Sequence, residues 1–224
     1  IDHPVLNVVK HVRGILDEHL SKQFLCAGGI PVVAETVVNS REEAVNAADE
    51  LTFPVVMKGL LQDVVHKSDH GLVHLHLNSE ADVAQAFEAL SQVIDNQDKI
   101  LLQHQVGGRA ELIVGMTRDS QFGTCVMCGI GGVLAEAIQD RVFLVTPFGM
   151  KEALYMMDCL KFQCILNGFR GEAPLDRQLL ADILVRIGRI AESYPAILEM
   201  DINPLIIENG RPVAVDATIV LQES

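Results

Sequence analysis

A β-hairpin near the C-terminus is the sequence feature that most constrains the fold. Asn209 and Gly210 lie between two apolar runs that are rich in β-branched residues, and Asn-Gly in that setting is the strongest short-range signal for a hairpin. The two arms are therefore predicted to pair as antiparallel strands. This pairing would bring the amide oxygen of Asn203 and the carboxylate of Asp216 to neighbouring positions.

These two oxygen donors suggest a magnesium site. Mg2+ prefers a few protein oxygens and completes its shell with phosphate oxygens and water. The alternative is an ordinary acidic hairpin with a solvated aspartate, and the two residues alone leave both interpretations open.

Composition limits the class of protein. The chain has 224 residues, of which 49% are hydrophobic, enough for one large domain or two small lobes. Its net charge of -13 argues against a broad surface for nucleic acid or anionic membrane, although lysines and a metal ion can still neutralise nucleotide phosphates locally. No apolar run approaches the roughly 20 residues of a membrane helix. The chain opens on Ile1 rather than Met, so we expect a separate subunit or a part of a longer polypeptide.

The cysteines indicate a reducing compartment. Five cysteines in a chain of this size do not form a disulfide framework, so the expected location is the cytoplasm. Cys125 and Cys128 form a CxxC pair, but on a predicted strand positions i and i+3 point to opposite faces. We interpret both as small core residues rather than zinc ligands.

The pattern of apolar residues and turn signals predicts mixed secondary structure. Helices are expected over 3–27, 41–51, 79–94, 147–160 and 176–193. Strands are expected over 31–38, 53–58, 71–77, 99–106, 110–117, 124–128 and 142–145, in addition to the hairpin. Because strands and helices do not alternate regularly, the predicted class is α/β or α+β with largely antiparallel sheets.

Two stretches in the first half carry candidate chemistry. Lys58 ends an apolar strand, which suits either a ligand-binding ammonium or a surface lysine with a buried stem. In the loop that follows, backbone amides and the side chains of Lys67 and Ser68 could cradle phosphate oxygens, and Gly71 would permit close approach. His66 suits a phosphate ligand, a general base or a nucleophile toward phosphorus. A plain polar hairpin loop is the alternative.

Two further features are weaker. His74 and His76 share one face of a predicted strand and are interpreted as solvent-facing, with a metal cluster as the alternative. The loop at 129–132 is rich in glycine but matches neither GxGxxG nor the P-loop pattern. Glu111 and Glu136 lie on either side of this loop, where either could bind a sugar hydroxyl or a substrate.

Several motifs in a fixed order resemble those of a known family. They are Gly29-Ile30-Pro31-Val32, Phe53-Pro54-Val55-Val56-Met57-Lys58, His66-Lys67-Ser68-Asp69, Glu111-Leu112-Ile113-Val114-Gly115, Arg118 to Gly123, Gly131-Gly132-Val133, and Asp201-Ile202-Asn203-Pro204-Leu205 with Asp216. The series resembles the ATP-grasp domain of NDP-forming acyl-CoA synthetases, which include ADP-forming acetyl-CoA synthetase and are related to succinyl-CoA synthetase. The resemblance runs from about residue 12 to the C-terminus.

This resemblance implies an ATP-grasp fold, in which two α+β lobes clasp Mg-ATP. The boundaries expected here are an N-terminal helical segment over 1–28, an N-terminal lobe over 29–103 and a C-terminal lobe over 104–224. By resemblance, Lys58 reaches the phosphates and the loop from His66 to Gly71 covers them. The strand end that contains Gln103, Gln105 and Val106 would hold adenine through backbone groups.

The resemblance also implies the remaining roles. Glu111 is expected to contact the nucleotide, and Asn203 and Asp216 to ligate Mg2+. His66 would shuttle a phosphoryl group between the nucleotide and a phosphohistidine in a partner domain. The family reaction joins a small carboxylic acid to CoA and couples this to ATP and ADP. Because the CoA-binding and phosphohistidine-bearing domains are not in these residues, we expect no complete turnover from the chain alone and an oligomeric assembly in the full enzyme.

Two departures from the family pattern leave a rival open. Leu72 stands where the family usually has glycine, and Gln139-Asp140-Arg141 replaces the commoner Lys-Asp-Val, with Arg141 as the candidate replacement for the lysine. The rival is a ligand-sensing, non-catalytic ATP-grasp module of the kind fused to some protein lysine acetyltransferases. A carboxylate-amine ligase is a third, weaker interpretation.

Overall fold

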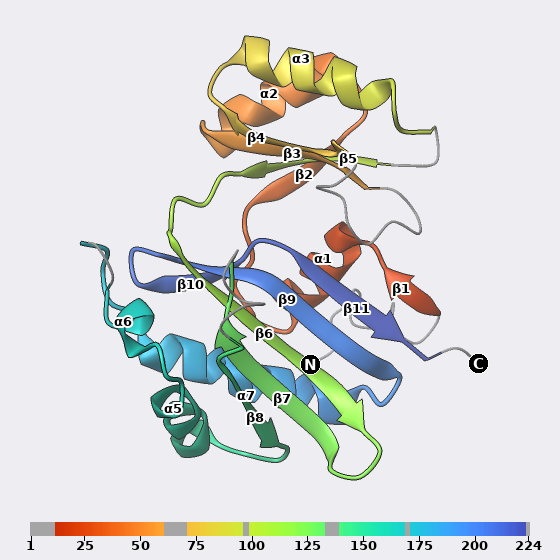
Figure 1. The fold of residues 1–224 in the computed structure, drawn as a ribbon. Helices are drawn as coiled ribbons and strands as arrows, with labels where there is room; N and C mark the ends of the chain where they lie inside the picture. Colours follow the sequence, from red (N-terminus) through yellow and green to blue (C-terminus); the bar gives the residue numbers. More distant parts are fainter. Residues whose placement is uncertain (1–11, 61–70, 96–98, 133–138, 169–170, 223–224) are drawn as a thin grey trace. The chain divides into compact units, whose positions relative to one another are not determined.

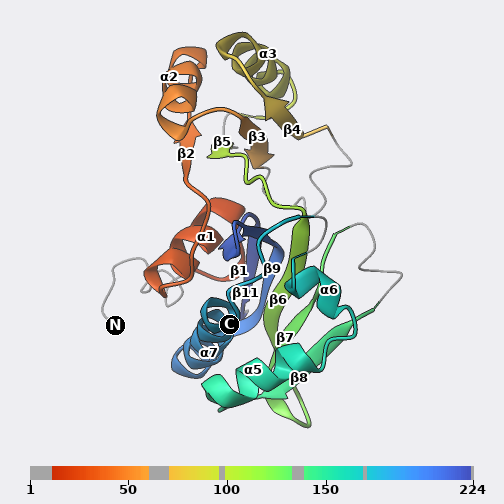
Figure 2. The ribbon, with the colours of Figure 1, turned by 90° about the vertical axis from the view of Figure 1, so that its left-hand side faces the viewer.

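The computed structural model describes residues 12–60, 71–95, 99–132, 139–168 and 171–222 (Figures 1 and 2). Contacts within the chain divide it into two units, a larger one of residues 1–32 and 107–224 and a smaller one of residues 33–106. The limits from the sequence, at 28/29 and 103/104, lie close to these and remain a prediction for the domains as such. No helix among the described residues is long and apolar enough to cross a membrane.

The larger unit is built on a sheet that has seven strands among its described residues. The strand order is β1 (Gly14–Leu16), β11 (Ala217–Leu221), β9 (Ile197–Glu208), β6 (Ala110–Asp119), β7 (Gly123–Ile130) and β8 (Arg141–Val145), and β10 (Arg211–Ala214) also pairs with β9. All of these ladders are antiparallel, as the sequence predicted.

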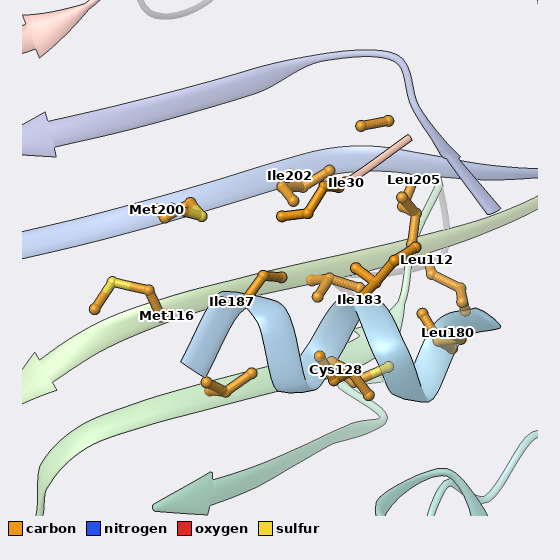
Figure 3. Packing of buried hydrophobic residues seen from close by; sticks show 14 of the residues in the cluster. Ile30, Leu112, Met116, Cys128, Leu180, Ile183, Ile187, Met200, Ile202 and Leu205 are labelled. Carbon is orange, nitrogen blue, oxygen red and sulfur yellow. The ribbon is translucent and has the colours of Figure 1, made fainter. Parts of the chain in front are cut away.

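Helices cover one face of this sheet. They are α1 (Glu18–Ala27), α5 (Met150–Asp158) and α7 (Arg177–Ser193), with the short α6 (Gln163–Leu166) nearby (Figure 2). Figure 3 shows Leu180, Ile183 and Ile187 of α7 against the strand residues that point toward them. Those strand residues include Leu112, Met116, Cys128, Met200, Ile202 and Leu205. The opposite face of the sheet therefore carries the alternate residues of each strand.

The N-terminal part differs from the predicted long helix. Residues 1–11 lie outside the described residues, Gly14–Leu16 forms β1 against β11, and α1 begins only at Glu18. Asp17 is the N-cap, since its side chain accepts a hydrogen bond from the Leu20 backbone N–H at 2.8 Å. Apolar spacing alone did not reveal this start, because the short strand places apolar residues at positions that also fit a helix.

The smaller unit is a sheet of four strands, counted over its described residues, with two helices on one face. The order is β2 (Glu35–Val38), β5 (Lys99–His104), β3 (Val55–Leu60) and β4 (Val73–Leu77), all antiparallel. The helices α2 (Arg41–Leu51) and α3 (Glu80–Ser91) lie on the same side of this sheet (Figure 1). Ser40 and Ser79 cap them, as the sequence predicted, by accepting hydrogen bonds from the N–H groups of Glu43 and Asp82.

Candidate functional site

The predicted hairpin is present and its turn is Asn209-Gly210. Both residues have positive φ, +50° and +80°, which a tight two-residue hairpin turn requires. Arg211 pairs with Glu208, and this register continues without a shift through Ala214–Leu205 to Ala217–Ile202.

The hairpin brings Asn203 and Asp216 together. The Asn203 backbone N–H donates to the Asp216 carbonyl at 3.1 Å, so the two residues lie directly opposite each other. The geometric expectation from the sequence is confirmed, while their role as metal ligands stays a prediction.

A β-bulge interrupts the pairing of β9 with β6 at Asn203 and Pro204. On the side toward β6, Leu205 pairs with Leu112 and Ile202 with Val114, so Asn203 and Pro204 together oppose the single residue Ile113. Before the bulge, Met200 and Ile202 are buried in the core, while Asn203 is exposed. Asn203 thus lies away from the core by strand alternation, and the extra residue of the bulge lets Leu205 return to the core. Bulges are frequent beside functional sites.

Asp201 adds a second carboxylate to this region. It lies two residues before Asn203 on β9 and pairs with Thr218. The pKa of Asp201 is raised to about 6, mainly by burial and also by the charges of Glu199 and Asp216, while the charge of Arg141 acts to lower it. The sequence analysis did not name Asp201 as a site residue. Its signal was the alternation of Glu199, Asp201 and Asn203 with the buried Met200 and Ile202.

Arg141 contributes a positive charge to the same region. It begins β8 and pairs with Gly129, where an added Cβ would lie 2.8 Å from the Arg141 Cγ. The glycine therefore leaves room for the arginine side chain to cross β7. The neighbouring Asp140 has a structural part, since its buried carboxylate accepts hydrogen bonds from the N–H groups of Lys161 and Phe162 at 2.8 to 3.0 Å.

Glu111 lies beside the glycine-rich segment, as the sequence suggested. Its carbonyl accepts a hydrogen bond from the Gly131 N–H at 2.8 Å, and a Cβ at Gly132 would lie 3.3 Å from the Glu111 Oε2. Burial raises the pKa of the Glu111 carboxyl group. Gly129 belongs to β7 rather than to a loop, which corrects the prediction for 129–132. Glu136 lies outside the described residues.

In the smaller unit, Lys58 and Gln103 are buried in the four-stranded sheet. Lys58 is 5% exposed and pairs with Leu101 and Val73, while Gln103 is 1% exposed and pairs with Val56. Their strand neighbours Met57 and Leu102 belong to the core beneath α2 and α3. By strand alternation, Lys58 and Gln103 lie on the face away from these helices.

The segment after β5 is held by both its backbone and its side chains. The Gln105 N–H donates to the Pro54 carbonyl at 2.9 Å. The Gln105 Oε1 accepts the His76 N–H at 2.7 Å, and the Gln105 Nε2 lies 2.7 Å from the His76 Nδ1. The Gln105 side chain is thus bound to β4. The prediction that this segment holds adenine therefore concerns its backbone groups only. Val106 is buried and ends the smaller unit.

The predicted phosphate loop is described only at its end. His66, Lys67 and Ser68 lie outside the described residues, whereas Gly71 is exposed and has φ +70°. Leu72 is fully buried in the core of the smaller unit, and its carbonyl accepts the Gly59 N–H at 2.8 Å. The substitution of glycine by leucine at this position therefore has a packing role.

Other predictions on metal and thiol chemistry can be compared with the structure. Within the described part of the chain, no group of three or more His, Cys, Asp or Glu is placed to hold a metal ion. Cys128 is in the core while Cys125 lies on the other face of β7, as strand alternation predicted. Burial raises the pKa of the Cys128 thiol to about 12, which fits a structural cysteine rather than a zinc ligand.

Comparisons with known proteins agree with this geometry. A family model described as an ATP-grasp domain matches residues 7–221. The beta subunit of the ADP-forming acetate–CoA ligase I of Pyrococcus furiosus is 37% identical over 212 residues, which cover 92% of this chain and 91% of that subunit. The ADP-forming acetate–CoA ligase I of Archaeoglobus fulgidus is 42% identical over 204 residues, which cover 88% of this chain but only 30% of that longer protein.

A solved structure is similar over nearly the whole chain. It is the dinucleotide-forming acetyl-coenzyme A synthetase 1 of Ca. Korarchaeum cryptofilum in complex with coenzyme A and Mg-AMPPCP, with its phosphohistidine segment pointing towards the nucleotide binding site. The TM-score is 0.84 with 39% identity, covering 97% of this chain and 98% of that one.

The pKa of Asp201 generates a prediction about stability and pH. The folded pKa of Asp201 is about 6 and its ordinary value is 3.8, so between these values the folded chain binds a proton that the unfolded chain does not hold. The contribution of this group to the stability of the metal-free chain therefore rises as pH falls through about 6 toward 3.8, and it is lost as pH rises above 6. We expect Asp201→Asn to raise the melting temperature at pH 8 and to have little effect near pH 4, measured by thermal unfolding with a chelator present.

Asp119 provides a matched control, because the pKa of its carboxyl group is lowered where that of Asp201 is raised. Its carboxylate accepts hydrogen bonds from the N–H groups of Phe122 and Gln121, and these lower its pKa. Asp119→Asn should therefore give no gain at pH 8. Equal melting temperatures for Asp201→Asn and the unmodified chain at pH 8 would contradict the assigned environment of Asp201.

Proposed function

Because the chain belongs to the ATP-grasp domain family, we propose that it is the nucleotide-binding subunit or domain of an NDP-forming acyl-CoA synthetase. In this role it exchanges a phosphoryl group between Mg-ADP or Mg-ATP and a phosphohistidine relay. The relay in turn drives acyl-CoA formation from a small carboxylic acid and CoA.

The observation that carries the proposal is the pairing of Asn203 with Asp216. One amide oxygen and one carboxylate lie opposite each other on a hairpin of fixed register, beside the carboxylate of Asp201. This donor set fits Mg2+, which takes few protein oxygens when phosphate oxygens complete its shell. The bound ion would neutralise phosphate charge during phosphoryl transfer. Asn203 and Asp216 would hold it, and Arg141 would add positive charge near the phosphates.

The smaller unit is proposed to bind the nucleotide itself. Lys58 has a buried stem on a central strand, which suits an ammonium that reaches phosphate oxygens. Backbone groups of the segment Gln103–Val106 are proposed to hold the adenine, and the Gln105 side chain supports that segment through its hydrogen bonds to His76. In the larger unit, Glu111 is proposed to contact the nucleotide, with Gly131 and Gly132 allowing close approach.

The catalytic residue of the proposal is His66, with Lys67, Ser68 and Gly71 covering the phosphates. A ring nitrogen of His66 attacks the phosphorus held by the partner's phosphohistidine, so one P–N bond forms as another breaks. The phosphoryl group then passes from His66 to the terminal phosphate oxygen of ADP, and the free imidazole is restored. The reverse sequence starts from ATP. The phosphohistidine segment named in the similar solved structure supports this proposal.

The partner is proposed to be a second subunit or domain that binds CoA and carries the first phosphohistidine. The beta subunit from P. furiosus is matched over most of its length, while the single-chain relative from A. fulgidus is about three times longer than the matched part. Both arrangements fit a chain that supplies only the nucleotide half of the reaction within an oligomeric enzyme. The five cysteines are free thiols, which supports a reducing compartment such as the cytoplasm.

The rival regulatory module loses its main support. Leu72 kept that reading open as a departure from the family pattern. Because Leu72 fills the core of the smaller unit, the departure is explained by packing and does not indicate a degenerate nucleotide site. The relatives from P. furiosus and A. fulgidus are ADP-forming CoA ligases, which also favours the catalytic role.

The first test measures metal-dependent nucleotide binding. We expect calorimetric titration with ADP to show binding that Mg2+ strengthens, and Asn203→Ala and Asp216→Ala to weaken the Mg2+-dependent part by about tenfold or more, because each removes an oxygen ligand. Asp182→Ala is the matched control, since Asp182 is a partly exposed carboxylate on α7 that pairs with Arg186. Unchanged Mg2+ dependence in both variants would contradict the metal site.

The second test follows the phosphoryl group. When the chain is incubated with radiolabelled ATP and the partner subunit, we expect an acid-labile label on this chain, because phosphohistidine is the proposed intermediate. His66→Ala should carry no such label. Stable labelling of that variant at the level of the unmodified chain would remove His66 from the relay, even if nucleotide binding is intact.

A further inference from the structure

Helix α1 carries an ion pair that is completely buried. The Lys22 Nζ lies 2.7 Å from the Glu18 Oε1, and the two side chains are 0% and 1% exposed. Such a pair is weak evidence for stability, because the cost of desolvating both charges offsets their attraction. Stability alone therefore does not explain why this pair is buried, and its other contacts indicate a different role.

Lys22 also contacts the metal-binding hairpin of the proposed function. Its Nζ donates a hydrogen bond to the Val215 carbonyl at 3.2 Å, across 193 positions of sequence. Val215 lies opposite Pro204, to whose carbonyl the Val215 N–H donates at 3.1 Å. Proline has no backbone N–H, so Pro204 cannot donate back to Val215 as an ordinary strand partner would. The Lys22 ammonium supplies a donor to the carbonyl that faces this proline.

The next residue along the chain is Asp216. Its carbonyl accepts the Asn203 N–H at 3.1 Å, so β9 holds the peptide segment 215–216 from one side and Lys22 holds it from the other. A partly buried carbonyl that loses its hydrogen-bond donor loses stability, so the Lys22 contact favours the present position of this segment.

We propose that Lys22 is a positioning residue for Asp216, with Glu18 as the counter-charge that holds the ammonium in place. The inference rests on the proposed function, because it concerns the metal site of that function. The pair sets the backbone from which the Asp216 carboxylate projects, beside Asn203. Its removal lowers metal affinity in the presence of nucleotide and leaves the fold intact.

The test separates positioning from stability by removing both charges together. Lys22→Met alone leaves Glu18 buried without its counter-charge, which is destabilising in itself. The double variant Glu18→Gln with Lys22→Met keeps the side-chain sizes close and leaves no buried charge from the pair, but it removes the donor to Val215. The matched control is Asp182→Asn with Arg186→Met, which removes another i,i+4 ion pair of the same unit, at 2.6 Å and with side chains 46% and 39% exposed.

Three quantities are measured on the full chain: Mn2+ affinity in the presence of ADP, ADP affinity without metal, and amide hydrogen exchange at Asn203 and Val215. In the first double variant we expect Mn2+ affinity to fall about tenfold, as is typical when a group that orients a metal ligand is lost. ADP affinity without metal should stay unchanged, and both amides should exchange faster because the segment loses the Lys22 contact. The control pair should change none of the three.

Each other outcome overturns the inference in a recognisable way. A folded Glu18→Gln, Lys22→Met variant with unchanged Mn2+ affinity and amide exchange shows that Lys22 does not position Asp216, while the proposed function stands. A double variant that does not fold shows that the pair holds the whole unit together. An unmodified chain that binds no Mn2+ with ADP overturns the proposed function and the role of Lys22 together.

Discussion

The antiparallel pairing of β9 with β10 and β11 is the constraint on which the rest of the larger unit depends. One register runs from the Asn209-Gly210 turn through the Asn203–Asp216 pair to the Val220–Glu199 pair, and it shifts only at Leu221. On its other edge, β9 pairs with β6 through a β-bulge, in which Asn203 and Pro204 together oppose Ile113. The same strand thus closes the core with Met200, Ile202 and Leu205 and turns polar side chains to the opposite face.

That opposite face explains the electrostatics of the candidate site. Glu199, Asp201 and Asp216 carry like charges close together, and Arg141 offsets them in part. Such an arrangement is unfavourable for the chain alone, since it raises the pKa of Asp201 and costs stability at neutral pH. A divalent cation relieves the repulsion, so the local cost and the proposed metal site have one physical origin. The buried Glu18–Lys22 pair of α1 holds the same hairpin through the hydrogen bond from Lys22 to the Val215 carbonyl.

Local signals in the sequence were sufficient for the hairpin, both serine caps and the antiparallel class, because each depends on residues near one another in the chain. The opposition of Asn203 and Asp216 followed from the turn alone. The predicted start of the first helix was wrong, because the apolar residues of the short strand β1 lie at positions that also fit a helix. Asp201 and Lys22 were missed: the strand pairing places Asp201 beside Asp216, and a helix-to-hairpin contact places Lys22 against Val215. The family resemblance identified residues for the nucleotide, and their roles are still predictions.

Anomalous X-ray scattering from crystals grown with Mn2+ and ADP would test the proposed metal site directly. We predict an anomalous peak in direct coordination with the Asn203 amide oxygen and the Asp216 carboxylate, with phosphate oxygens of ADP completing the shell. A peak held by other residues, or ADP bound in the crystal with no metal at this pair, would contradict it.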